Sequence, residues 1–185
     1  MKPINNYILE KLKINKSKLS GGLEYTLFPK TREELVKMIK EEIEINGNEC
    51  SLNHIDVSKI TDMRHLFSYS TFNGDISEWD VSNVENMDHM FFYAEEFTGE
   101  NTNINDWDVS NVENMVCMFW KSGFNQPLND WDVSNVKSMG NMFRESKFNQ
   151  DISMWKINKN CDYTMIFLSS DIKEKYKPFK NGKRI

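Results

Sequence analysis

The sequence has no apolar run that approaches the roughly 18 residues a transmembrane helix requires. Residues 1–14 lack the continuous apolar stretch and the small-residue cleavage site of a secretory signal. We therefore expect a soluble protein with no membrane span and an intracellular location.

Cysteine is scarce, and the three cysteines are scattered at Cys50, Cys117 and Cys161 without a C-x-x-C pair. This spacing argues against a disulfide framework and against a zinc site, so free thiols in a reducing compartment are expected. Phosphate-binding, dinucleotide-binding and nucleophile-elbow motifs are also absent from the sequence. We expect no cofactor, no metal ion and no catalytic residue.

Positive charge is scarce in the middle of the chain. Residues 51–160 carry eight basic and seventeen acidic side chains, whereas residues 1–20 carry five lysines and one glutamate. An acidic body repels phosphate backbones, so nucleic-acid binding is disfavoured.

The most prominent feature of the sequence is an internal repeat. The hexapeptide Trp-Asp-Val-Ser-Asn-Val begins at Trp79, Trp107 and Trp131, and degenerate copies begin at Ile55 and Trp155. The anchors are separated by 24, 28, 24 and 24 residues, and the longer interval comes from an insertion around residues 95–103. A fixed period in this range is the signature of a repeat architecture.

The rest of the unit keeps the same register. Each anchor is followed twelve residues later by phenylalanine. A methionine stripe precedes it, which could form a groove but which we interpret as core: Met63, Met87, Met90, Met115, Met118, Met139 and Met142. From Ile76 the apolar spacing matches the L-x-x-L-x-L of leucine-rich repeats.

This pattern predicts an α/β fold, a short right-handed leucine-rich-repeat-like solenoid with a small parallel sheet and an N-terminal capping helix. Trp79-Asp80-Val81 would be a short strand with its tryptophan and valine pointing inward. Residues 84–91 would follow at helical or 3₁₀ spacing.

Four segments are expected along the chain. Residues 1–20 form a basic leader and linker, either a short helix that packs on the body or an amphipathic docking or membrane-surface segment. Residues 21–50 form the N-terminal cap, with a helix at about 31–46 that opens on the capping-box sequence Thr31-Arg-Glu-Glu34. Residues 51–168 hold the five repeats, and residues 169–185 form a basic tail.

The unit Trp-Asp-Val-Ser-Asn-Val-x-x-Met-x-x-Met-Phe, with Phe148-Asn-Gln-Asp-Ile-Ser153, resembles the BspA-like repeats of mycoplasma-lipoprotein and bacterial surface proteins. The resemblance covers residues 52–168 and implies adhesion or protein binding. The lead-in Phe28-Pro-Lys-Thr-Arg is similar to versions encoded by phages and prophages. The mycoplasma and bacterial surface relatives usually carry export signals or surface anchors, whereas this sequence lacks such a signal, so we expect a bacterial cytoplasmic or virion location instead of a surface adhesin.

The residue after each anchor forms the first candidate surface: Asp56, Asp80, Asp108, Asp132 and Lys156. Like charges on adjacent rungs repel one another, so the row requires an explanation. The carboxylates could form a structural ladder of local hydrogen bonds, bind a partner, or hold calcium; the Gly-rich nonapeptide of calcium-binding repeats is absent.

Phe92, Tyr93 and Trp120 depart from the template and form the second candidate surface, beside the insertion. Cys117 is interpreted as a core residue rather than a nucleophile. His54, His65 and His89 form no metal-binding motif, and we interpret their registers as differing between repeats, which argues against catalysis.

The expected function is a non-catalytic protein–protein interaction module whose partner is another protein. The alternative is a structural or packaged virion protein, and a hydrolase is the least favoured reading.

Overall fold

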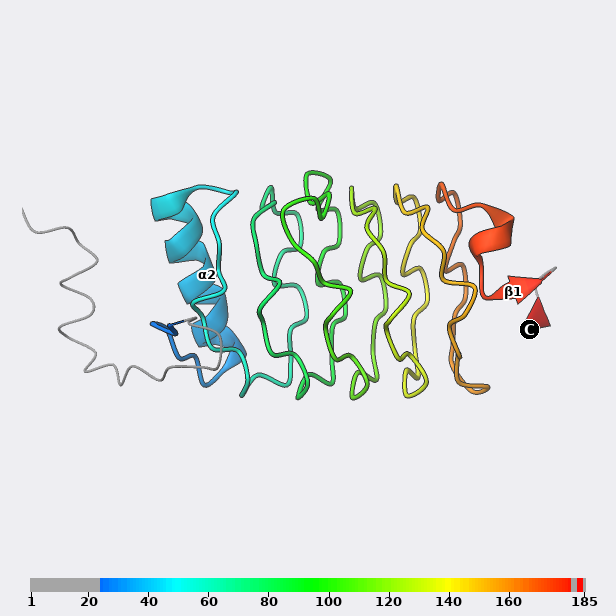
Figure 1. The fold of residues 1–185 in the computed structure, drawn as a ribbon, viewed down its shortest axis with the longest axis horizontal. Coiled ribbons are helices and arrows are strands. Elements are labelled where there is room, and N and C mark those ends of the chain that lie inside the picture. Colours follow the sequence, from blue (N-terminus) through cyan, green and yellow to red (C-terminus); the bar gives the residue numbers. More distant parts are fainter. Residues whose placement is uncertain (1–23, 181–182, 185) are drawn as a thin grey trace, which may run out of the picture.

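The computed structural model describes residues 24–180 and 183–184. Helix α2 (Arg32–Asn46) lies at one end, the repeats follow side by side along the long axis, and a short C-terminal segment lies at the other end (Figure 1). That segment contains the 3₁₀ helix η1 (Glu174–Tyr176) and the antiparallel two-residue strands β1 (Phe179–Lys180) and β2 (Lys183–Arg184). The expected basic leader, residues 1–20, lies outside the described residues.

Helix α2 begins and ends as its sequence predicts. The hydroxyl of Thr31 accepts the N–H of Glu34 at 3.2 Å, and Gly47 closes the last turn at φ 85° by donating its N–H to the carbonyl of Ile43. Leu35 and Ile39 form the buried face and join the hydrophobic core of the repeats. The helix expected over about 31–46 is confirmed.

The predicted α/β solenoid with a small parallel sheet is wrong. In the described residues the repeats contain neither a strand nor a helix, and most of their residues lie in turns and irregular segments. Parallel pairing is reduced to isolated bridges, and none of them lies at Trp-Asp-Val. Four bridges lie seven residues after the anchors and join Asp62 to Asn86, Asn86 to Asn114, Asn114 to Ser138 and Ser138 to Asp162. Two more lie near the N-terminal end and join Leu27 to Ile55 and Ser51 to Asp75.

Local hydrogen bonds explain why no strand forms at Trp79-Asp80-Val81. The carboxylate of Asp80 accepts the N–H of Ser82 at 3.1 Å, and the N–H of Val84 donates to the carbonyl of Val81 at 2.9 Å. The N–H of Trp79 donates to the carbonyl of Ile76 at 3.3 Å, so local turns occupy donors in and directly after the expected strand. A turn replaces the strand because aspartate and serine compete successfully with backbone pairing.

A different ladder joins adjacent repeats on the segment after the bridge. Every second N–H donates to a carbonyl of the next repeat, while the intervening N–H groups close turns three residues back. The bonds between the second and third repeats run from Met87 to Asn114, His89 to Val116, Phe91 to Met118 and Tyr93 to Trp120, at 2.8 to 2.9 Å.

The alternation depends on left-handed backbone. The residues ten and fourteen positions after each anchor all have φ between 53° and 58° and none is glycine. Such a residue every fourth position prevents a continuous right-handed helix. The predicted helical or 3₁₀ segment is therefore replaced by a string of turns.

The core consists of aromatic columns that run through the repeats. Phe67, Phe91, Phe119 and Phe143 stack in order with ring centroids 5.4 to 5.6 Å apart and planes within 4°. The anchor tryptophans are at most 6% exposed, and the whole methionine stripe is buried. The interpretation of the stripe as core, rather than as a groove, is confirmed.

The C-terminal segment continues this packing. Phe179 is buried and stacks on Tyr163 with ring centroids 4.6 Å apart. The N–H of Ile152 donates to the carbonyl of Tyr176 at 3.1 Å, which ties this segment to the repeats. The division of the chain into four segments stays a prediction.

Candidate functional site

The carboxylates that follow the anchors each accept a hydrogen bond from their own turn. Asp108 and Asp132 accept the N–H groups of Ser110 and Ser134, both at 3.0 Å, and Asp56 does the same with Ser58 at 3.1 Å. The hydrogen bonds from Ser134 lower the pKa of Asp132 below its ordinary value, with a smaller contribution from the charge of Lys156. These local bonds supply the structural role that the row of like charges required.

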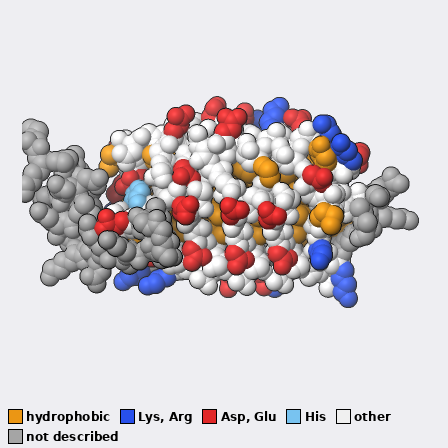
Figure 2. Space-filling view, viewed as in Figure 1, with side chains coloured by type: hydrophobic (Ala, Val, Ile, Leu, Met, Phe, Trp, Pro, Cys, Tyr) orange, Lys and Arg blue, Asp and Glu red, His pale blue; other side chains and the backbone are white. Residues whose placement is uncertain are grey.

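A second row of acidic side chains precedes the anchors. Glu78, Asp106 and Asp130 are exposed, as are Asp80, Asp108 and Asp132. Figure 2 shows acidic side chains in rows across this face of the repeats. Among the residues that the structure describes, no lysine or arginine forms an ion pair with these six carboxylates. We call these six residues the acidic face.

A shallow hollow lies within the acidic face between the second and third repeats. It is lined by the acidic side chains of Glu78, Asp80, Asp106 and Asp108 and by Asn103, among others. The amide of Asn103 donates to Asp106 at 2.6 Å. Lys156, at the end of the first row, is exposed and is the only basic side chain at that repeat position.

Four aromatic side chains from three successive repeats gather on another part of the surface. Their centroid distances are 5.3 Å from Tyr69 to both Phe92 and Tyr93, and 5.4 Å from Phe92 to Trp120. Tyr69 is 70% exposed and the other three are partly exposed. We call Tyr69, Phe92, Tyr93 and Trp120 the aromatic patch. Three of the four were expected from sequence, and Tyr69 was missed.

Two cations border the aromatic patch. Nζ of Lys121 lies 4.7 Å from the ring centre of Tyr93, and Cζ of Arg144 lies 4.4 Å from that of Trp120. Each cation also pairs with a carboxylate, Glu95 for Lys121 and Glu145 for Arg144, both at 3.1 Å. Glu95 belongs to the insertion, so the expected position of this surface beside the insertion is confirmed.

One polar atom of the patch lacks a hydrogen-bond partner. Nε1 of Trp120 is shielded from solvent, and no acceptor for it lies within the described part of the chain. A shielded donor left unpaired costs about 1–3 kcal/mol. The position of Trp120 therefore costs folding free energy that the positions of the anchor tryptophans do not cost.

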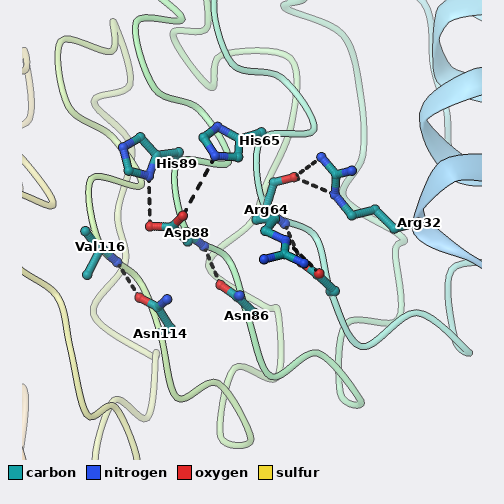
Figure 3. Close-up of polar contacts among 9 residues, drawn as sticks. Arg32, Arg64, His65, Asn86, Asp88, His89, Asn114 and Val116 are labelled. Atoms are coloured by element: carbon teal, nitrogen blue, oxygen red, sulfur yellow. Dashed lines mark hydrogen bonds and ion pairs between the residues drawn. The ribbon is translucent and has the colours of Figure 1, made fainter.

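His65, Asp88 and His89 converge next to the aromatic patch (Figure 3). The two imidazoles stack with centroids 4.8 Å apart, and the carboxylate of Asp88 lies 2.8 Å from Nδ1 of His89 and 3.9 Å from Nε2 of His65. Burial lowers the pKa of His65, and the charges of His89, Arg32 and Arg64 lower it further, against an opposing effect of Asp88.

The sequence carried a signal for this cluster. His65 and His89 both lie ten residues after their anchors, at Ile55 and Trp79. The interpretation that the histidine registers differ was wrong for this pair and holds for His54 alone. Equivalent positions on adjacent repeats place side chains next to one another, which is why the two rings meet.

The comparisons with known proteins give a family for this chain. A family model described as "Mycoplasma protein of unknown function, DUF285" matches residues 33–155 and, in a second match, residues 98–179. The chain belongs to this family. No curated protein and no solved structure matches the chain.

The two DUF285 matches together cover α2 apart from Arg32, the repeats and the C-terminal segment as far as Phe179. The resemblance to mycoplasma-type repeats is therefore confirmed at the level of the family. DUF285 is described by its occurrence and not by an activity, so the family assigns no role to the surfaces above.

The remaining candidate residues of this DUF285 chain lie apart from these surfaces or are buried. His54 lies 3.4 Å from Glu42 of α2. Cys117 is 5% exposed, and burial raises the pKa of its thiol to about 11, with a further contribution from Asp88. A buried, protonated thiol is a poor nucleophile, so the interpretation of Cys117 as an interior residue is confirmed.

A separate finding concerns membrane-spanning helices. No helix among residues 24–180 is long and apolar enough to cross a membrane.

Proposed function

We propose that this protein is a non-catalytic module that binds another protein through the aromatic patch. The single observation that carries the proposal is the convergence of Tyr69, Phe92, Tyr93 and Trp120, from three repeats, on one partly exposed area. Exposed aromatic clusters are rare on surfaces without a binding role.

The composition of the patch supports a protein partner. Tryptophan, tyrosine and arginine are the residues most enriched among those that dominate binding energy in protein interfaces. The patch contains the first two, and Arg144 stacks on Trp120. The repeat ladder holds the backbones of Tyr69 and Tyr93, which donate to the next repeat at 2.8 Å. A fixed patch loses little conformational entropy on binding.

The acidic face supports a partner with a basic surface. Six carboxylates without lysine or arginine partners in the described residues create a negative potential over one side of the repeats. Such a field accelerates encounter and orients the partner, while it adds less to affinity than buried aromatic contacts do. The two surfaces therefore have separable effects on binding.

The test is affinity capture from the natural host cells followed by a direct binding measurement with the purified partner. Tyr69→Ser with Tyr93→Ser should weaken binding by at least about 30-fold, since dominant interface residues contribute about 2 kcal/mol or more each. Replacing Asp80, Asp108 and Asp132 by asparagine should mainly slow association and reduce its dependence on salt.

A matched control uses exposed apolar residues outside the patch. Ile45 and Met154 are 63% and 80% exposed. Changing both to serine should leave binding unchanged. Equal loss of binding in the control and in the tyrosine variant, or full binding by the tyrosine variant, would contradict the assignment of the patch.

The finer origin and location are also proposals. The similarity of Phe28-Pro-Lys-Thr-Arg to phage-encoded versions supports a phage or prophage gene. The free cysteines support a reducing, intracellular compartment. The alternative, a packaged virion protein directed by its basic leader, predicts that deletion of residues 1–20 abolishes particle association.

A further inference from the structure

Two imidazoles and a carboxylate are brought together by the repeat itself. His65 and His89 occupy the same position in adjacent repeats, with φ values of 58° and 55°, so their side chains leave the backbone in the same direction. The N–H of His65 donates to the carbonyl of Asp88 at 3.0 Å, which fixes the spacing between the two turns. Asp88 precedes His89 and faces both rings (Figure 3).

The atoms that face one another are metal ligands. Nδ1 of His89 and Nε2 of His65 both point at the carboxylate of Asp88, at 2.8 and 3.9 Å. One ligand atom from each of the three residues lies within 4.8 Å of the other two. Imidazole nitrogen and carboxylate oxygen are the donors that zinc accepts in proteins.

We propose that His65, Asp88 and His89 form a binding site for a divalent transition-metal ion, with Zn²⁺ as the ion that fits the donor set best. Zinc bonds of about 2.0–2.2 Å place the ligand atoms of a tetrahedral site about 3.3 Å apart. The longest separation between the ligand atoms, which all lie within 4.8 Å of one another, must therefore shorten. The side chain of His65 is 47% exposed and is free to make this adjustment by rotating about its own bonds.

The neighbouring cations are bound elsewhere. Nε of Arg64 pairs with Asp62 at 2.9 Å, and the guanidinium of Arg32 donates twice to the backbone carbonyl of Arg64, at 2.8 and 2.6 Å. Their positive charges weaken the site, but their hydrogen-bonding groups do not occupy the ligand atoms. The carboxylate of Asp88 provides the negative charge that offsets them at the site.

Three protein ligands leave at least one coordination position for water or for an added donor. His89 also packs against the ring of Phe92, with centroids 4.8 Å apart, so the ion would sit at the border of the aromatic patch. The metal site does not depend on the proposed protein-binding function, because its ligands come from this chain alone.

The test is a calorimetric titration of the full chain with ZnCl₂ alone, in a Cys50→Ser background because Cys50 is the only cysteine that is not buried. The expected result is one bound ion per chain. His65→Ala and His89→Ala should each weaken binding by at least about 10-fold, because even residues that only support metal ligands contribute 10–100-fold.

Two further variants separate a metal site from a structural cluster. Asp88→Asn can still hydrogen-bond to His89 but is a poorer ligand, so it should weaken zinc binding while circular dichroism and thermal stability stay close to wild type. His54→Ala is the matched control, because His54 also lies beside a carboxylate, Glu42 at 3.4 Å. It should bind zinc as the parent does.

Imidazole nitrogen resonances give a readout that does not depend on affinity alone. Zn²⁺ should shift the signals of His65 and His89 and leave those of His54 in place. No binding at millimolar zinc, equal binding by the His65, Asp88 and His89 variants, or a shift confined to His54 would each overturn the proposal.

Discussion

The anchor tryptophans combine burial with a directed hydrogen bond. Nε1 of Trp79, Trp107, Trp131 and Trp155 each donates to the carbonyl three residues before the previous anchor, at 2.8 to 3.3 Å. A buried indole N–H without an acceptor would be costly, so this bond allows a large ring to occupy the core. It also connects each repeat to the one before.

Trp131→Phe should therefore lower the free energy of unfolding by about 2 kcal/mol, because the carbonyl of Ile104 loses its donor and the ring is smaller. Urea denaturation monitored by circular dichroism measures the change. Trp120→Phe is the control: its Nε1 has no acceptor in the described residues, so the same substitution should cost much less. Equal losses at the two positions would contradict the role given to the indole bond.

At the scale of the element, the string of turns after each bridge replaces the predicted helical or 3₁₀ segment. Its left-handed residues include tyrosine, cysteine, lysine and glutamate, which are uncommon in that conformation. This strain is offset because the left-handed residues direct alternate N–H groups toward the next repeat, where each donates to a carbonyl. Non-local hydrogen bonds thus determine a local conformation.

Ser169 tests this strain, since it is exposed and has φ 58°. Ser169→Val should destabilise the protein by about 1–2 kcal/mol, because a β-branched side chain tolerates left-handed backbone poorly, whereas Ser169→Asn should be neutral or stabilising. Thermal unfolding by calorimetry compares the two variants. Glu96→Val, at an exposed site without positive φ, should change stability little. A valine at 169 without cost would show that the strain is absent.

At the scale of the whole molecule, the contacts between repeats are nearest-neighbour contacts in a fixed register. The third repeat donates from Met115 and Cys117 to Ser138 and Gly140, and the fourth donates from equivalent positions to Asp162 and Thr164. The carbonyls that these two repeats use are therefore interchangeable. The fold is modular in units of one period.

Deletion of residues 131–154 should consequently give a folded protein of lower stability. Trp155 would take the place of Trp131 and donate its indole N–H to the carbonyl of Ile104. The m-value, which is the slope of the unfolding free energy against urea concentration, should fall because unfolding of the shorter chain exposes less surface. Deletion of residues 131–142 removes half a period and should prevent cooperative folding. Urea titration distinguishes the two; an unfolded protein after the full-period deletion would contradict modular stacking.

The sequence by itself determined the features that repeat with the period and the two ends of helix α2. The anchors, the buried tryptophan, methionine and phenylalanine positions, and the bounds of α2 all follow from spacing and capping chemistry, because burial and helix termini depend on residues close in sequence. The membership of three aromatic residues in one surface was also readable, since they break the template beside the insertion.

Only the tertiary structure decided which backbone groups pair between repeats. The expected strand at Trp79-Asp80-Val81 does not pair with its neighbour, and bridges form instead at Asn86 and its equivalents. Tertiary structure likewise added Tyr69 to the aromatic patch and brought His65 to Asp88 and His89. These contacts join residues 23 or more positions apart, so they depend on how the turns stack, which local preference does not specify.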